Sequence, residues 1–178
     1  RGWHRLQLAA ECLQKYAWAY EAPEKPEKKK SRPLIMGSLI HLALAQRYAR
    51  MRASQDPLRS LATQDLPEDW CEPEEAVELI AKLEKNEEYI EPVLATYKAY
   101  DDEHQHEQEE MKILEVEELV STKIGGKYLL TGRLDLVYED LGGRVWGMDH
   151  KTTSRLTARH KQYYAISGQL MGYSYMAK

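Results

Sequence analysis

The chain has 178 residues, of which 43% are hydrophobic and 30% charged, with a formal net charge of −4. This length and composition can bury one sizeable hydrophobic core, so we expect a single domain over residues 1–178. The sequence has no apolar run long enough for a membrane span or secretory signal. Its two cysteines lie far apart and give no disulfide framework, so a reducing, cytoplasmic setting is expected.

Residues 33–51 are predicted to form a helix. Ser31 is a candidate N-cap and Pro33 stands near the first turn. Apolar residues recur with helical spacing at Leu34, Leu39, Leu42, Ala45 and Tyr48. His41 lies in this pattern, with Gly37 one turn before it and Ala45 one turn after it, so another element can approach the imidazole closely. Two interpretations stay open, a core histidine and a metal ligand.

Residues 56–110 match no motif that indicates a function. Pro67 and Pro73 interrupt this segment, whereas Glu74–Lys85 and Glu87–Glu107 have helical spacing and strongly acidic outer faces. We interpret residues 54–110 as a helical insertion that packs over the core. His104 and His106 would face apart on a helix, so we do not predict a metal site there.

Two consecutive segments carry the most informative residues. Tyr128–Tyr138 is rich in Leu, Thr, Val and Tyr and contains Gly132-Arg-Leu-Asp135, while Val145–Lys151 ends in Asp149-His-Lys151. The link Glu139–Gly143 is typical of a hairpin, so the two strands should pair antiparallel and Asp135 can reach Asp149. Because strand side chains alternate, Asp149 and Lys151 should share one face and His150 the other.

The expected grouping of Asp135, Asp149 and Lys151 would suit metal-dependent cleavage of a phosphodiester. Two adjacent carboxylates repel each other, and a hard cation such as Mg²⁺ or Mn²⁺ removes that cost while taking them as ligands. The ammonium of Lys151 can then offset charge that develops on a phosphate. An Asp-x-Lys tripeptide alone more often marks a solvated strand edge with a weak ion pair, so the motif depends on its context.

Residues 161–178 are predicted to form another helix. Helical spacing relates Tyr164, Gly168, Gln169, Gly172, Tyr173 and Met176. Gln169 and Tyr173 lie one turn apart and present an amide and a phenol that can hydrogen-bond a phosphate or a lysine. The alternative is an ordinary interfacial tyrosine with a polar neighbour.

Together these elements resemble the RecB-like and phage-exonuclease branch of the PD-(D/E)XK nucleases. The matching pieces, in family order, are Met36-Gly-Ser-Leu-Ile-His41, Gly132-Arg-Leu-Asp135, Asp149-His-Lys151 followed by Thr152-Thr153, and Gln169-Leu-Met-Gly-Tyr173. Leu6–Tyr20, with Cys12 and Tyr16, looks like the family's opening helix. The resemblance implies an α/β (α+β) fold with a restriction-endonuclease-like core, in which helices flank a central mixed β-sheet in the order α-β-β-β-α-β.

The resemblance also implies residue roles. The metal ligands would be His41, Asp135, Asp149 and the backbone carbonyl of His150, and Lys151 would be the catalytic lysine. Gln169 and Tyr173 would match the family's QxxxY signature, which supports the lysine and touches the DNA backbone. Glu117, on the predicted strand Lys112–Ser121, stands where many relatives keep an acidic residue, and Glu115 faces the same side.

Two departures from the family pattern are visible. Some relatives bind an iron-sulfur cluster through one cysteine in the opening helix and three near the C-terminus. Here only Cys12 and Cys71 are present, so we predict no cluster in this chain. The family also has a strand after the Gln169 helix, beyond Lys178, so we expect the chain to be part of a longer polypeptide.

The expected function is a Mg²⁺- or Mn²⁺-dependent DNA exonuclease in recombination, repair or phage DNA processing, within a bacterial or phage-infected cell. Relatives include ring-shaped oligomers, so a homo-oligomer or a larger complex is compatible with the resemblance. The alternatives are a catalytically inactive nucleic-acid-binding module and an acidic cluster that only binds cations. The negative net charge opposes DNA binding, but basic runs at Lys25–Arg32 and Lys151–Lys161 could form a local rim, or be solvated loops.

Overall fold

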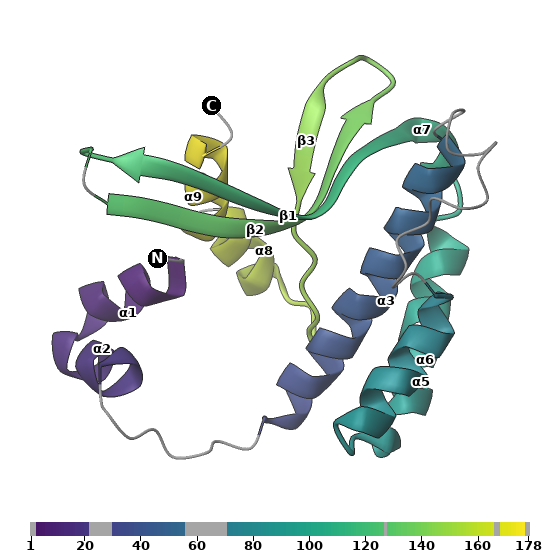
Figure 1. The fold of residues 1–178 in the computed structure, drawn as a ribbon, viewed down its shortest axis with the longest axis horizontal. Helices are drawn as coiled ribbons and strands as arrows, with labels where there is room; N and C mark the ends of the chain where they lie inside the picture. Colours follow the sequence, from purple (N-terminus) through teal and green to yellow (C-terminus); the bar gives the residue numbers. More distant parts are fainter. Residues whose placement is uncertain (1–2, 22–29, 56–70, 127, 166–167, 177–178) are drawn as a thin grey trace. The chain divides into compact units, whose positions relative to one another are not determined.

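The computed structural model describes residues 3–21, 30–55, 71–126, 128–165 and 168–176, shown in Figure 1. Residues 25–29 of the basic run at Lys25–Arg32 and residues 56–70 of the predicted insertion lie outside these residues. The described helices and strands are α1 (Trp3–Glu11), α2 (Leu13–Tyr20), α3 (Arg32–Gln55), α5 (Pro73–Leu83), η1 (Glu87–Tyr89), α6 (Ile90–Glu103), α7 (Glu107–Glu110), β1 (Met111–Ile124), β2 (Tyr128–Asp140), β3 (Val145–Met148), α8 (Ala158–Ala165) and α9 (Gly168–Met176). This mixed helix and strand content confirms the predicted α/β class.

The chain packs as two compact units. Unit 1 comprises residues 1–29, 119–133 and 154–178, and unit 2 comprises residues 30–118 and 134–153. Both β1 and β2 contribute residues to each unit. All of the predicted metal ligands belong to unit 2, whereas Gln169 and Tyr173 belong to unit 1.

Helix α3 confirms the helix predicted over residues 33–51 and extends it at both ends. The Ser31 carbonyl accepts hydrogen bonds from the backbone N–H groups of Leu34 and Ile35, at 2.9 and 3.0 Å, which starts the helix. The buried side differs from the predicted stripe, because Leu34 is 57% exposed and Ile35 is buried in its place. The buried face continues through Leu39, Ile40, Ala43, Leu44, Arg47, Tyr48 and Met51.

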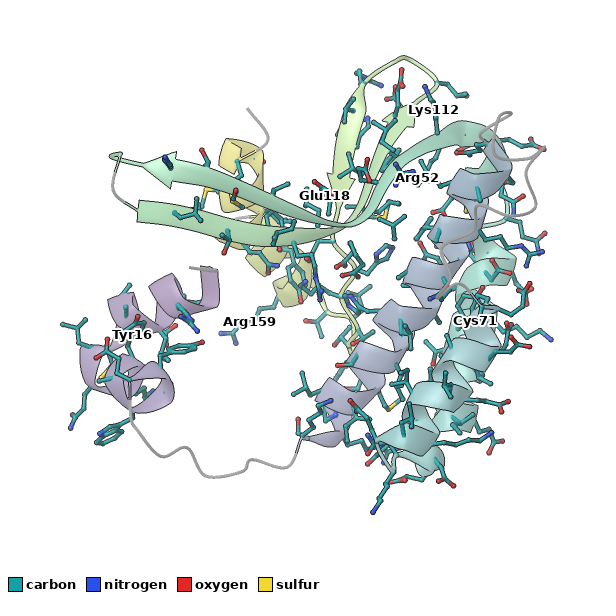
Figure 2. The ribbon with its side chains drawn as sticks, in the orientation of Figure 1. Tyr16, Arg52, Cys71, Lys112, Glu118 and Arg159 are labelled. Carbon is teal, nitrogen blue, oxygen red and sulfur yellow. The ribbon has the colours of Figure 1, made fainter. Side chains whose placement is uncertain are left out.

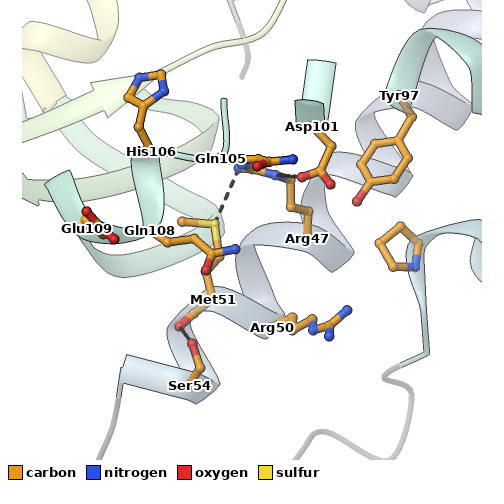
Figure 3. Close-up of a pocket in the computed structure, with 11 residues that line it drawn as sticks. Arg47, Arg50, Met51, Ser54, Tyr97, Asp101, Gln105, His106, Gln108 and Glu109 are labelled. Carbon is orange, nitrogen blue, oxygen red and sulfur yellow. Dashed lines mark hydrogen bonds and ion pairs between the residues drawn. The ribbon is translucent and has the colours of Figure 1, made fainter. Parts of the chain in front are cut away.

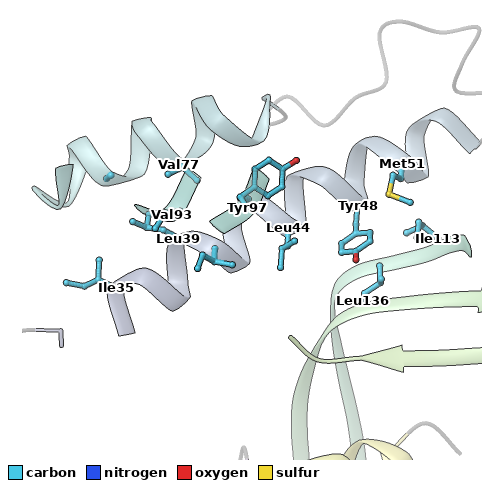
Figure 4. Packing of buried hydrophobic residues seen from close by; sticks show 13 residues of the cluster. Ile35, Leu39, Leu44, Tyr48, Met51, Val77, Val93, Tyr97, Ile113 and Leu136 are labelled. Carbon is cyan, nitrogen blue, oxygen red and sulfur yellow. The ribbon is translucent and has the colours of Figure 1, made fainter. Parts of the chain in front are cut away.

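Helices α3, α5 and α6 form the core of unit 2, where they run alongside one another in Figure 1. Val77 from α5 and Val93 from α6 are fully buried against α3, and Leu136 of β2 completes the cluster from the sheet (Figure 4). The two helices predicted for the insertion are therefore confirmed over the described residues. Their apolar sides are part of the core rather than a separate layer over it.

The sheet has the strand order β1-β2-β3, and β2 pairs antiparallel with β3, as predicted. Leu136 lies opposite Met148 and Tyr138 opposite Trp146 in this register. Continuing the register by one residue places Asp135 opposite Asp149. Strand β3 ends at Met148, earlier than predicted, so Asp149 and Lys151 lie in the segment that follows the strand.

The turn between β2 and β3 is organised by the Asp140 carboxylate. It accepts hydrogen bonds from the backbone N–H groups of Gly142 and Arg144, at 2.8 and 3.0 Å, and from the Trp146 indole at 2.9 Å. Gly143 has a φ of 76°, a conformation that glycine adopts readily. The hydrogen bond from the Arg144 backbone, followed by that from Trp146, lowers the pKa of Asp140 to about 2.

We expect the Asp140 carboxyl to titrate below an ordinary aspartate in ¹³C NMR. Its stabilising effect on the hairpin should be complete above the unfolded value of roughly 3.9. That effect should be lost as the pH falls through the folded pKa of about 2. Arg144→Ala removes the guanidinium contact with Asp140 at 3.0 Å but keeps the backbone donor. In this variant the titration midpoint of Asp140 should therefore rise only partway toward the value of an ordinary aspartate. An ordinary aspartate midpoint in the wild-type chain would contradict this account.

Unit 1 contains the two terminal helical regions. The opening helix predicted over Leu6–Tyr20 is divided into α1 and α2, because Cys12 has an extended backbone with φ −164° and ψ 111°. One extended residue is enough to turn the helix axis, and apolar spacing alone does not reveal it. The helix predicted over residues 161–178 corresponds to α8 and α9, while residues 166–167 and 177–178 lie outside the described residues.

Gly132 provides the space that α9 needs against β2. A Cβ atom at this position would lie 2.5 Å from Cε1 of Tyr173 and 2.8 Å from Cε of Met176. We therefore expect Gly132→Ala to lower the free energy of unfolding by about 1–3 kcal/mol, as overpacking typically does.

Gly172→Ala is the matched control, since a Cβ at Gly172 meets nothing within 4 Å. This change should leave stability unchanged or raise it by up to about 1 kcal/mol, because alanine favours the helix. Urea denaturation measures both variants. A Gly132→Ala protein at least as stable as the wild type would show that the contact is not restrictive.

Candidate functional site

The structure brings together an imidazole and two carboxylates in unit 2. Ligand atoms of His41 on α3, Glu117 on β1 and Asp135 on β2 all lie within 4.8 Å of one another, and all three residues are partly buried. Carboxylate oxygens are the ligands that Mg²⁺ prefers, and a site that adds an imidazole also suits Mn²⁺. The donor set therefore fits a small divalent cation.

Asp135 is the centre of this group. Its Oδ2 atom accepts the backbone N–H of His150 at 2.6 Å, and the Nδ1 atoms of His41 and His150 lie 3.4 and 3.6 Å away. Burial alone would raise the pKa of Asp135, but the hydrogen bonds from His150 and His41 outweigh it and hold that pKa well below its usual range. The carboxylate is therefore ionised and oriented at neutral pH.

The His41 imidazole responds to the same charges. Its hydrogen bond with Asp135 raises the pKa of His41 above the ordinary value, although burial opposes this effect, and the charge of Lys151 opposes it further. Gly37, one turn earlier, confirms the predicted close approach, because a Cβ there would lie 3.2 Å from Oγ1 of Thr152. The segment after β3 thus passes close to α3 beside the imidazole.

Glu117 has an unusual backbone for a strand residue. Its φ is 55°, in the left-handed region that few residues other than glycine adopt. Glu115, two residues earlier, is held by the Arg52 guanidinium of α3 at 2.7 and 3.0 Å (Arg52 is labelled in Figure 2). Both acidic side chains thus approach residues of α3, as the predicted alternation requires.

Asp149 and Lys151 form an ion pair with each other. The Asp149 side chain is 5% exposed and that of Lys151 36%, so the carboxylate is buried and the ammonium reaches solvent. This contact confirms that the two side chains share one side. Asp149 is not a member of the His41–Glu117–Asp135 group, and its role as a metal ligand stays a prediction.

His150 places its backbone and its ring in different surroundings. Its carbonyl, the predicted backbone ligand, lies 3.5 Å from Nζ of Lys151. Its imidazole is 12% exposed and packs near the rings of Tyr48 and Tyr100, with centroid separations of 5.7 and 5.8 Å. The sequence did not identify these tyrosines, because Tyr48 reads as a core residue and Tyr100 lies in the segment without motifs.

A family model for the PD-(D/E)XK nuclease superfamily matches residues 3–178. The chain belongs to the PD-(D/E)XK nuclease superfamily. This membership confirms the superfamily to which the sequence was assigned and the restriction-endonuclease-like fold, while the RecB-like branch stays a prediction. It supports nuclease activity that uses divalent metals on a nucleic-acid substrate. No curated protein and no solved structure gave a match.

In this PD-(D/E)XK protein the glutamine and tyrosine of the predicted signature form a direct contact. Nε2 of Gln169 donates to the Tyr173 hydroxyl at 2.8 Å, and that hydroxyl donates to the Arg133 carbonyl at 2.8 Å. The predicted one-turn spacing is confirmed, and it ties α9 to β2 within unit 1. Support of the lysine and contact with DNA stay predictions for these two residues.

A pocket of about 740 Å³ opens elsewhere on unit 2 of this superfamily member (Figure 3). Its lining comes from α3, α5, α6 and the region around α7, and includes Arg47, Arg50, Tyr97 and Asp101. None of the predicted site residues lines it. Among the described residues, no helix has both the length and the apolar character needed to cross a membrane.

Proposed function

We propose that this chain is a metal-dependent deoxyribonuclease of the RecB-like branch, an exonuclease that acts on DNA ends in recombination, repair or phage DNA processing. The observation that carries the proposal is the group formed by His41, Glu117 and Asp135 in a superfamily member. The Asp149–Lys151 ion pair directly follows β3, and β3 pairs with β2, the strand that carries Asp135.

His41, Glu117 and Asp135 would hold the cation, with Asp149 and the His150 carbonyl as further ligands. Mg²⁺ or Mn²⁺, when bound, supplies positive charge that polarises a phosphate and lowers the pKa of water. Asp135 is suited to this role because its hydrogen bonds keep it ionised and fix one of its oxygens. Glu117 adds a second negative charge from the neighbouring strand.

Lys151 would stabilise the negative charge that develops on the phosphate. Its ammonium is partly exposed, so it can reach a substrate, and the buried Asp149 carboxylate limits its freedom. Because the ammonium is already oriented before the reaction, little free energy is needed to reorient it in the transition state. Gln169 and Tyr173 are proposed to contact the DNA backbone.

DNA is the proposed partner, with a homo-oligomer or a larger recombination or repair complex as the proposed assembly. A single family match across both units supports one nuclease domain over residues 1–178. Cytoplasm, in a bacterium or a phage-infected cell, is the proposed location, and the chain's two widely separated cysteines support it.

The test uses linear and covalently closed circular DNA with Mg²⁺, with Mn²⁺, or with a chelator. An exonuclease should degrade only the linear form and only with metal. Cleavage of the circular form would indicate an endonuclease. Salt-sensitive DNA binding without cleavage would instead favour an inactive binding module. Absence of both binding and cleavage would leave only a cation site.

Lys151→Ala is expected to lower the cleavage rate by about 10²-fold, the usual cost of losing one preorganised electrostatic group. Lys112→Ala is the matched control, because Lys112 is 69% exposed on β1 and pairs with Glu139 at 3.5 Å (Figure 2). The control should retain the wild-type rate. Single-turnover cleavage measures both, and a Lys151→Ala rate equal to that of the control would remove the lysine from the mechanism.

A further inference from the structure

A tyrosine of the predicted insertion contacts the His150 imidazole. The Tyr100 hydroxyl on α6 lies 3.4 Å from Nε2 of His150, within hydrogen-bonding distance. On the other side of the ring, Nδ1 lies 3.6 Å from the Asp135 carboxylate. The His150 imidazole therefore connects α6 to Asp135, the central residue of the His41–Glu117–Asp135 group.

The Tyr100 hydroxyl is itself fixed by buried groups. It shares a hydrogen bond of 2.8 Å with the Tyr48 hydroxyl, which donates to Oε2 of Glu107 at 2.9 Å. Glu107 is 3% exposed and accepts a further hydrogen bond from Arg47 at 2.8 Å. Buried polar groups that satisfy one another in this way define one arrangement of the side chains.

This arrangement constrains the backbone of His150 as well as its ring. The backbone N–H of His150 donates to Asp135 at 2.6 Å, so a shift of the residue changes that hydrogen bond. Groups that orient a metal ligand without touching the metal commonly alter metal affinity or activity by about 10–100-fold when they are removed.

We propose that Tyr100, fixed by Tyr48 and Glu107, is a positioning residue that holds His150 and thereby orients Asp135 toward the bound cation. This inference rests on the proposed function, because it takes the His41–Glu117–Asp135 group as the cation site. It gives the segment around α6 and α7 a role in the chemistry, although that segment contains none of the predicted ligands.

Tyr100→Phe tests the proposal, since it removes one hydroxyl and keeps the ring. Tyr97→Phe is the matched control on the same helix, where Tyr97 is 6% exposed and, among the described residues, its hydroxyl bonds neither Glu107 nor His150. Mn²⁺ affinity is measured by electron paramagnetic resonance on the full chain without DNA. Tyr100→Phe should raise the Mn²⁺ dissociation constant about 10-fold, and Tyr97→Phe should leave it unchanged.

A second variant, Tyr48→Phe, removes the hydroxyl between Tyr100 and Glu107 and should weaken Mn²⁺ binding in the same direction. In cleavage assays, Tyr100→Phe should require more Mn²⁺ for half-maximal rate while its KM for DNA stays unchanged. A merely structural role would reduce the amount of active protein but change neither constant. Wild-type Mn²⁺ affinity in Tyr100→Phe would overturn the positioning role, and wild-type affinity in Tyr48→Phe alone would remove Tyr48 from it.

The metal and DNA measurements separate the two proposals. If the wild-type chain binds Mn²⁺ and Tyr100→Phe weakens that binding, the positioning role is supported even when no DNA is cut, and only the nuclease proposal fails. If the wild-type chain cuts DNA with Mn²⁺ and Tyr100→Phe binds the ion normally, only the positioning role fails. A wild-type chain that binds no Mn²⁺ would overturn both.

Discussion

Asp135→Asn should reduce metal-dependent DNA cleavage by about 10³-fold or more, because a bound metal supplies several kcal/mol of transition-state stabilisation. Asparagine keeps the shape of the side chain but removes the charge of the group on which His41 and His150 converge. Mn²⁺ titration and single-turnover cleavage should show weak binding and a low rate together. Thermal unfolding verifies that the variant is folded.

Asp140→Asn is the control for this substitution. Asp140 lies on the same strand, accepts several hydrogen bonds and has a lowered pKa, but it serves the turn between β2 and β3. This variant should cleave DNA at the wild-type rate even if the hairpin is less stable. If the two variants lost activity equally, the effect would come from the sheet and not from a cation site at Asp135.

Glu107→Ala is expected to lower the free energy of unfolding by about 1–3 kcal/mol, the typical cost of leaving a buried polar group without its partner. Arg47 is 4% exposed and would lose the Glu107 carboxylate, although it keeps its ion pair with Asp101 at 2.7 Å. The Tyr48 hydroxyl would lose its acceptor at the same time. Urea denaturation monitored by circular dichroism measures the change.

Arg50→Ala is the control, because Arg50 lies one turn after Arg47 on α3 and also forms an ion pair. Arg50 pairs with Glu72 at 2.9 Å, but the two side chains are 61% and 43% exposed. An exposed pair contributes only about 0–1 kcal/mol, so the control should be nearly as stable as the wild type. Equal losses for Glu107→Ala and Arg50→Ala would refute the idea that burial makes the Arg47–Glu107 pair important.

The local features of the site could be predicted from the sequence. The residues Glu139–Gly143 indicated a hairpin, and β2 and β3 do pair antiparallel, up to Leu136 opposite Met148. Asp149 and Lys151 were expected to lie on one side, which their ion pair confirms, although they follow β3 and are not part of the strand on which the expectation was based. These inferences depend on neighbours along the chain, where the backbone geometry leaves few alternatives.

Features that depend on distant residues could not be predicted. Arg47 and Glu107 are 60 positions apart, and nothing in the pattern of either helix indicates that these two charges meet in the core. The break at Cys12 depends on a single backbone conformation, which residue periodicity does not encode.

At Glu117, the left-handed backbone conformation lowers the stability of the fold, while the side chain contributes a carboxylate to the proposed cation site. A residue with a side chain gives up of order 1–3 kcal/mol in such a sparsely populated conformation, and glycine would relieve most of that strain. Glycine would also delete one of the two carboxylates that gather around His41. Selection for thermal robustness alone would therefore be expected to favour Glu117→Gly and weaken cation binding, whereas selection for catalysis would keep the strained glutamate.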